Sequence, residues 1–129
     1  MTQVLKRILF IEDEADIRTV AKMALEMVGG FEVRACASGA EGVAAAPDAK
    51  ADLVLLDVMM PGMDGPATLK ALRAIPQTAA TPVIFMTAKV QSSEVAGYKA
   101  LGALDVIPKP FSPMDLANQI RGIWERSNA

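Results

Sequence analysis

An unbroken apolar run that ends in a carboxylate constrains the fold of this chain more than any other feature. The run covers residues 53–56, and Asp57 follows it directly. Four consecutive apolar residues bounded by polar ones are typical of a strand buried on both faces, as in parallel sheets. Turn-forming residues come next, at 61–65. We therefore predict that Asp57 lies at the end of a buried strand, beside a loop.

Four further segments are predicted to be strands because they are short, apolar and bounded by turn residues or charges. They are residues 8–11, 31–36, 82–86 and 104–108. Stretches with apolar residues at helical spacing separate and follow them. These predicted helices cover about 13–28, 38–45, 66–75, 92–101 and 112–124.

Prolines and capping residues set two of the predicted helix boundaries. Ser38 is a suitable N-cap for the second helix, which should end near Ala45 because Pro47 and Asp48 follow. The last helix should begin at Ser112 and Pro113, since proline is well tolerated in a first helical turn.

The regular alternation of five strands with five helices predicts a doubly wound α/β fold with a parallel sheet covered on both faces. The flavodoxin-like strand order 2-1-3-4-5 suits five strands. In that order the first and third strands are neighbours, and ligands bind beyond their carboxyl ends. The side chains that follow the strands, Glu12, Asp13, Asp57, Thr87 and Lys109, should therefore converge at one edge.

The composition fits a single domain over residues 1–129, without an effector domain. The 129 residues are 52% hydrophobic, which is enough for a core, and the net charge of -2 gives no basic surface for nucleic acid. No apolar run is long enough to span a membrane and no signal-like segment is present, so we expect a cytoplasmic protein. The single cysteine, Cys36, and the absence of histidine exclude zinc fingers and catalytic dyads or triads that need His.

Carboxylates held close together repel each other unless one keeps its proton or a cation neutralises them. Mg²⁺ prefers oxygen ligands, so Asp13 and Asp57 with the backbone carbonyl of Met59 would suffice to bind it. Thr87 and Lys109 could then stabilise charge on a phosphoryl group. In that arrangement Asp57 would be the nucleophile.

The same residues give the chain its resemblance to a known family. It resembles the receiver domain of two-component response regulators over nearly its whole length, and it is most similar to the stand-alone, chemotaxis-regulator-like type. The resemblance rests on four motifs: Glu12–Asp13, LLDVMMPGMDG around Asp57, Thr87–Ala88, and Lys109-Pro110-Phe111.

The resemblance implies a phosphoryl acceptor rather than an enzyme with an external substrate. Asp57 would accept phosphate from a phosphohistidine on a sensor histidine kinase or a histidine phosphotransfer protein. Mg²⁺ would be held by Asp13, Asp57 and the Met59 carbonyl, with Glu12 assisting directly or through water. Thr87 would move to the aspartyl phosphate, Lys109 would pair with it, and the Lys109–Pro110 peptide would be cis.

The resemblance also implies how the signal leaves the domain. The face formed by the fourth helix, fifth strand and fifth helix would change its affinity for a downstream protein, in a monomer or a phosphorylation-dependent dimer. Val106 departs from the family pattern, because many receivers have a rotating Tyr or Phe at that position. Lys89 and Met59 occupy positions expected to affect dephosphorylation.

Two other functions remain open at this point. A haloacid-dehalogenase-like phosphatase also uses an Asp after a parallel strand, but it needs a second acid two residues later, where this chain has Met59. A pure interaction module with an unphosphorylated site is favoured only by the atypical Val106.

Overall fold

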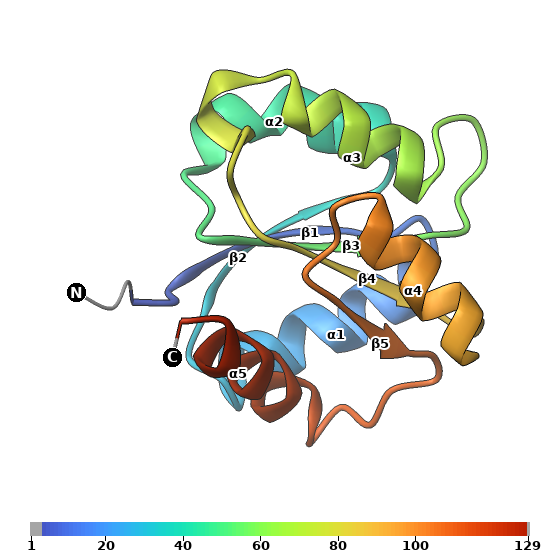
Figure 1. The fold of residues 1–129 in the computed structure, drawn as a ribbon. Coiled ribbons are helices and arrows are strands. Elements are labelled where there is room, and N and C mark those ends of the chain that lie inside the picture. Colours follow the sequence, from blue (N-terminus) through green and yellow to red (C-terminus); the bar gives the residue numbers. More distant parts are fainter. Residues whose placement is uncertain (1–3, 129) are drawn as a thin grey trace.

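The computed structural model describes residues 4–128, in which a parallel sheet lies between two layers of helices (Figure 1). The elements are β1 (Arg7–Ile11), α1 (Ala15–Met27), β2 (Glu32–Cys36), α2 (Gly39–Ala49), β3 (Leu53–Asp57), α3 (Gly65–Arg73), the 3-10 turn η1 (Pro76–Thr78), β4 (Val83–Thr87), α4 (Ser92–Ala100), β5 (Asp105–Pro108) and α5 (Leu116–Ser127). The predicted alternation of strands and helices is confirmed.

The strand order is β2-β1-β3-β4-β5, as predicted, with every neighbouring pair parallel. The register brings Ile11 opposite Leu56, and Asp57 opposite Met86. Because the strands are parallel and in step, the residues that follow β1, β3 and β4 reach the same edge of the sheet.

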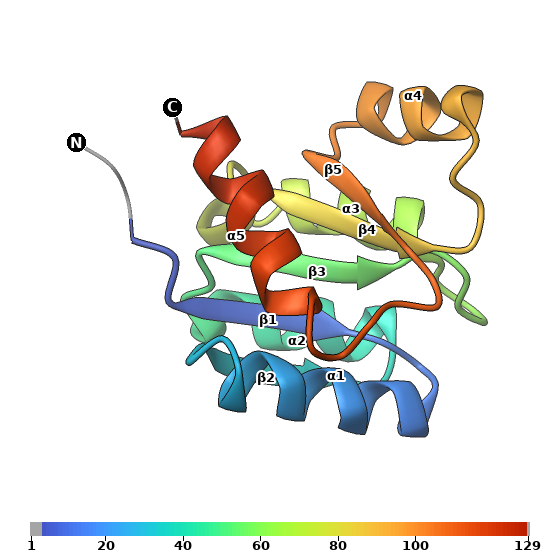
Figure 2. The ribbon, with the colours of Figure 1, turned by 90° about the horizontal axis from the view of Figure 1, so that it is seen from below.

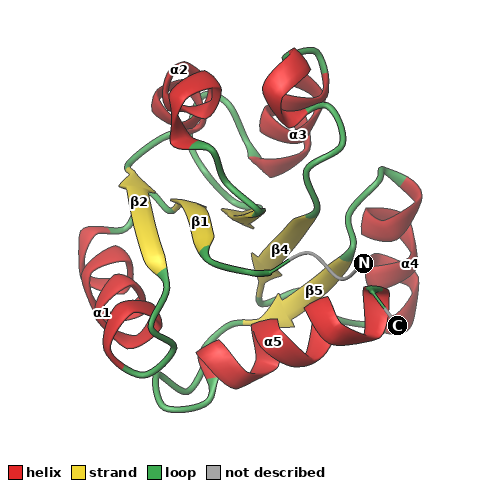
Figure 3. Ribbon diagram, turned by 90° about the vertical axis from the view of Figure 1, so that its left-hand side faces the viewer, coloured by secondary structure: helices red, strands yellow, loops and turns green. Residues whose placement is uncertain are grey.

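Helices cover both faces of the sheet (Figure 3). Figure 3 shows α2 and α3 on one face, α1 and α5 on the other, and α4 beside β5. In Figure 2 the view from below places α1 and α5 in front of the strands. Alternate strand residues therefore belong to two cores: Phe10, Leu55 and Met86 pack toward α1 and α5, whereas Leu56 and Phe85 pack toward α2 and α3.

The predicted end of the second helix near Ala45 is wrong. Helix α2 continues through Pro47 to Ala49 and ends at Lys50, whose φ of 50° is left-handed. Pro47 lies in the last turns, where its missing N–H removes a single helical hydrogen bond. Ala45 and Ala46 are buried in the core, and this packing holds the helix together across the proline.

The predicted start of the last helix at Ser112 is also wrong. Residues 113–115 form a turn in which the Ser112 carbonyl accepts hydrogen bonds from the N–H groups of Asp115 and Leu116, each at 3.0 Å. Helix α5 begins at Leu116, three residues after Pro113. This turn carries the chain around the end of the sheet before the apolar stripe of α5 can pack.

Helix α1 presents an apolar groove to solvent. Its core residues are Ala21, Ala24 and Leu25. The neighbouring apolar side chains Val20, Met23, Met27 and Val28 are exposed, and with Ala24, Pro113 and Met114 they line a groove of about 340 Å³. In the described part of the chain, the structure contains no helix with the length and apolar character of a membrane span.

Gly65 is the glycine whose replacement we expect to disturb the fold most directly at the site. A Cβ there would lie 2.7 Å from the Cα of Val58 and 2.8 Å from the carbonyl oxygen of Asp57. Both contacts are with backbone, which cannot rotate away. We expect Gly65→Ala to lower the free energy of unfolding by about 2 kcal/mol in a urea titration.

Gly97→Ala is the matched control, because Gly97 lies in α4 and a Cβ there meets nothing within 4 Å. This change should raise the stability by up to about 1 kcal/mol, the usual helix preference for Ala. Equal effects of the two substitutions would contradict the close packing at Gly65.

Candidate functional site

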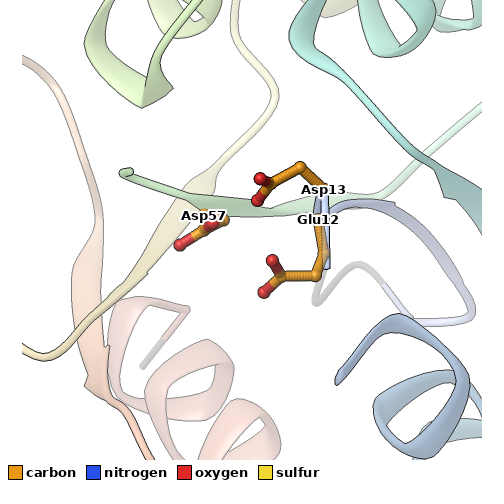
Figure 4. Close-up of side chains that lie close together, drawn as sticks. All are labelled: Glu12, Asp13 and Asp57. Atoms are coloured by element: carbon orange, nitrogen blue, oxygen red, sulfur yellow. The ribbon is translucent and has the colours of Figure 1, made fainter. Parts of the chain in front are cut away.

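Three carboxylates meet where β1 and β3 end. Glu12 and Asp13 follow β1, and Asp57 is the last residue of β3. A ligand oxygen from each of the three lies within 4.8 Å of the others. Figure 4 shows the three side chains directed toward one small region at the edge of the sheet. The convergence predicted for Glu12, Asp13 and Asp57 is therefore present.

Lys109 supplies the positive charge of the site. Its Nζ lies 2.7 Å from Oε1 of Glu12 and donates a hydrogen bond of 3.1 Å to Oδ1 of Asp57. The lysine is positioned from β5, since its backbone N–H donates to the carbonyl of Thr87 at 2.9 Å. The following Lys109–Pro110 peptide is cis, as the resemblance implied. One ammonium group thus contacts two of the three carboxylates.

Burial raises the pKa of two acids in the cluster, Glu12 and Asp57. The side chain of Glu12 is inaccessible to solvent, and this burial raises its pKa to about 7 although Lys109 acts to lower it. Burial also raises the pKa of Asp57, against the lowering effect of Lys109. For Lys109, burial lowers the pKa, but the two carboxylates outweigh it and the net direction is upward. Burial of these carboxylates therefore favours a proton or a bound cation at the site.

Asp13 provides the clearest sign that the site fits a cation. Its Oδ1 is buried and has no hydrogen-bond partner among residues 4–128. A buried carboxylate oxygen without a partner is costly, so such atoms usually contact an ion or water. Three oxygen donors within reach of one another match the preference of a hard divalent cation such as Mg²⁺.

Thr87 ends β4 and is buried, but its hydroxyl is engaged by its own loop. The Thr87 Oγ1 accepts a hydrogen bond of 3.1 Å from the backbone N–H of Lys89. The sequence did not predict this contact, which depends on how the chain turns after the strand. The hydroxyl is thus tied to the loop that leads into α4.

The other residues singled out from the sequence differ in how exposed they are. Met59 is 63% exposed, two residues after Asp57, and Lys89 is exposed as well. Val106 is half-buried and packs against the core on the α3 side. Gly65 was expected only as a turn residue; its N–H donates to the Val58 carbonyl at 2.9 Å, which fixes α3 against the end of β3. In the sequence, the only sign that Gly65 packs closely here is its place just after Asp64, at the start of a helix.

The raised pKa of Glu12 predicts how stability depends on pH in metal-free buffer. The folded protein holds this proton more tightly than the unfolded chain, whose Glu pKa is near 4.5. The stabilisation that comes from this proton is fully present below pH 4.5 and is lost as the pH rises through about 7. We expect a loss of up to about 3 kcal/mol over this window, measured by urea unfolding in a chelating buffer.

Glu12→Gln should remove the part of this pH dependence that comes from Glu12, leaving a contribution of Asp57 in the same direction. The chain has no histidine, so in the upper part of this window, above the range of ordinary carboxylates, no side chain with an ordinary pKa obscures the measurement. A wild-type stability that rises across the window would contradict the assignment.

Comparison with known proteins agrees with this geometry. Residues 8–121 match the family model described as "Response regulator receiver domain". The chain is 40% identical over 124 residues to the transcriptional regulatory protein CpxR of Escherichia coli, covering 96% of this chain and 51% of CpxR. It is 37% identical over 123 residues to the transcriptional regulatory protein ResD of Bacillus subtilis, covering 95% of this chain and 49% of ResD. The chain thus spans about half the length of these curated relatives.

Solved structures give the same result for the fold. The chemotaxis response regulator CheY4 of Vibrio cholerae superposes with a TM-score of 0.85 at 31% identity, covering 93% of this chain and 99% of CheY4. Receiver domains of this family are phosphoacceptor signalling domains that bind Mg²⁺ at an acidic pocket, and Glu12, Asp13 and Asp57 form such a cluster here. The chain belongs to the family of response regulator receiver domains.

Proposed function

We propose that Asp57 accepts a phosphoryl group from a phosphohistidine on a histidine kinase or a histidine phosphotransfer protein, and that the aspartyl phosphate switches the binding of a downstream protein. The observation that carries the proposal is the contact of one partly buried ammonium, Lys109, with both Asp57 and Glu12 in a cluster of three carboxylates. This arrangement holds a nucleophile and a cation together.

The transfer requires little more than positioning and charge. An Asp57 carboxylate oxygen forms a bond to phosphorus while the P–N bond of the phosphohistidine breaks, and its electron pair stays with the imidazole nitrogen. Lys109 moves from an ion pair with the carboxylate to one with the new phosphoryl oxygens. Because Asp57 is buried at a sheet edge, its orientation is fixed before the donor arrives.

Asp13, Asp57 and the backbone carbonyl of Met59 are the proposed ligands of Mg²⁺, with Glu12 assisting directly or through water. The unpartnered Oδ1 of Asp13 supports its role as a ligand. When bound, the ion supplies positive charge that offsets the charge on the phosphoryl oxygens. Glu12 also fixes Lys109, so it contributes to the site through that contact as well.

The phosphorylated state differs from the unmodified one at Thr87. Its hydroxyl leaves the N–H of Lys89 and donates to a phosphoryl oxygen, which releases the loop between β4 and α4. The face formed by α4, β5 and α5 then changes its affinity for a partner, in a monomer or in a phosphorylation-dependent dimer. Lys89 and Met59, both exposed beside the site, are the side chains proposed to set how fast water removes the phosphoryl group.

A protein donor has to approach from the edge of the sheet at which Asp57 lies. An apolar pocket there is lined by Lys109 and Phe111 together with Ile17 and Val20 of α1. Val20 also lines the groove formed by Met23, Met27 and Met114, so apolar surface extends from the site along α1. This surface suits an apolar helix face of the donor protein.

The proposal predicts a single phosphoryl transfer rather than the turnover expected of a phosphatase. The second acid that a haloacid-dehalogenase-like mechanism needs is replaced by Met59. With phosphoimidazole, which has the P–N bond of phosphohistidine, we expect rapid release of about one equivalent of imidazole followed by slow steady release. With p-nitrophenyl phosphate we expect no comparable burst, and sustained turnover of that ester would overturn the assignment.

A further inference from the structure

Helix α4 contacts the sheet through an aromatic pair and through an ion pair of 3.8 Å between Nζ of Lys99 and Oδ1 of Asp105 in β5. None of residues 92–100, all of which the structure describes, is buried. The largest side chain among them, Tyr98, is half-buried, and its ring centroid lies 5.4 Å from that of Phe85 at an interplanar angle of 72°. This edge-to-face geometry is a favoured one for aromatic pairs. The Phe85–Tyr98 pair is therefore the aromatic contact through which α4 meets the core of the sheet.

Phe85 also reaches toward the phosphorylation site. It is fully buried on β4, two residues before Thr87. A Cβ at Gly65 would lie 3.3 Å from Cε1 of Phe85 and 2.8 Å from the carbonyl oxygen of Asp57. The Phe85 ring thus lies between Tyr98 of α4 and the first residue of α3, which itself packs on the backbone of Asp57. The packing is continuous from Asp57 to α4.

Val106 is the neighbour of Phe85 across the sheet and faces the same core. Its side chain is short and β-branched, so it has few rotamers and cannot sweep between a buried and an exposed position. Tyr98 approaches the same core cluster from α4. The aromatic group that contacts Phe85 here is therefore supplied by the helix rather than by β5.

We propose that the Phe85–Tyr98 contact positions α4 according to the state of Asp57. In this proposal Tyr98 supplies the movable aromatic side chain that the short Val106 cannot supply. The inference rests on the proposed phosphorylation of Asp57. When the Thr87 hydroxyl releases the N–H of Lys89, the loop before α4 is free to shift. The contact of Tyr98 with Phe85 then determines the new position of α4. If occupancy of the site changes the affinity of α4 for a partner by some factor, then by linkage that partner changes the affinity of the site for its ligand by the same factor.

The test uses the fact that Tyr98 is the only tyrosine in the chain. The 129-residue chain labelled with 3-fluorotyrosine gives one protein ¹⁹F resonance, which is recorded before and after addition of Mg²⁺ and fluoroberyllate, a tetrahedral analogue of a phosphoryl group. Bound fluoroberyllate has its own ¹⁹F signal, so occupancy of Asp57 and the response of Tyr98 are read in one spectrum. We expect the Tyr98 resonance to move by more than its linewidth as the site fills.

Phe85→Leu should abolish most of this movement while fluoroberyllate still binds. Phe10→Leu is the matched control: Phe10 is also fully buried and two residues before a site residue, Glu12, but it faces the opposite core. We expect Phe10→Leu to keep the movement. If Phe85→Leu fails to fold, Tyr98→Leu, read through the backbone amide shifts of residues 92–100, replaces it with the same expected loss.

Two results overturn the inference. Bound fluoroberyllate with an unmoved Tyr98 resonance in the wild type would show that α4 does not respond through this contact. An unchanged movement in Phe85→Leu would show that the response takes another route. If no fluoroberyllate binds, the proposed function itself fails, and the inference fails with it.

Discussion

We expect the replacement of Asp57 with Asn to abolish phosphoryl acceptance, from a complete adduct to none, while the fold is kept. An amide is a poor nucleophile at phosphorus, and no other carboxylate in the cluster has the place of Asp57 at the end of β3. Lys109 keeps its contact with Glu12, so its ammonium stays paired. Because burial raises the pKa of Asp57, removing this charge should leave stability unchanged or slightly higher.

The measurement is intact mass after incubation with phosphoramidate and Mg²⁺, together with a urea titration of the variant. Asp16→Asn is the control, since it removes an exposed carboxylate near the same edge and should keep full labelling. An adduct on Asp57→Asn at the wild-type stoichiometry would contradict the assignment of the acceptor.

For Asp13→Asn we expect the second large effect, a loss of Mg²⁺ affinity of at least about tenfold, because substitutions of second-shell partners of metal ligands already cost about that much. The buried Oδ1 of Asp13 has no hydrogen-bond partner within the described chain, so an ion can gain most from this oxygen. Isothermal titration with MgCl₂ measures the affinity directly. Labelling by phosphoramidate should fall in parallel.

Glu14→Gln separates direct ligation from general electrostatic attraction. Glu14 is exposed next to Asp13 and contributes to the cluster only through its backbone N–H, which donates to Glu12. Its replacement removes the same charge but should change the affinity less than about twofold, as expected for a screened surface charge. Equal losses in Asp13→Asn and Glu14→Gln would mean that Asp13 is not a ligand.

Much of the fold could be predicted because its signals are local and repeated. Each buried strand is an apolar run, and each run ends in a polar residue, so parallel pairing alone brings Glu12, Asp13 and Asp57 to one edge. Their convergence did not require knowledge of side-chain packing. The strand order followed from the number and alternation of the elements.

The details that could not be predicted depend on contacts between distant parts of the chain. Pro47 does not end α2, because packing of the helix on the sheet outweighs the loss of one hydrogen bond. The bond from the Lys89 N–H to the Thr87 hydroxyl depends on a loop conformation that no residue pattern specifies. The contact between Tyr98 and Phe85 joins two elements whose spacing is set only by the folded core. A single domain and a cytoplasmic location stay predictions.

The most direct test of the central claim is the intact mass of the wild-type protein after incubation with phosphoramidate, with Mg²⁺ and with a chelator, followed by peptide mapping of any adduct. The account predicts one phosphoryl group per chain, located on Asp57 and formed only when Mg²⁺ is present. An adduct on another residue, or labelling at the same rate in the chelator, would contradict the proposed site.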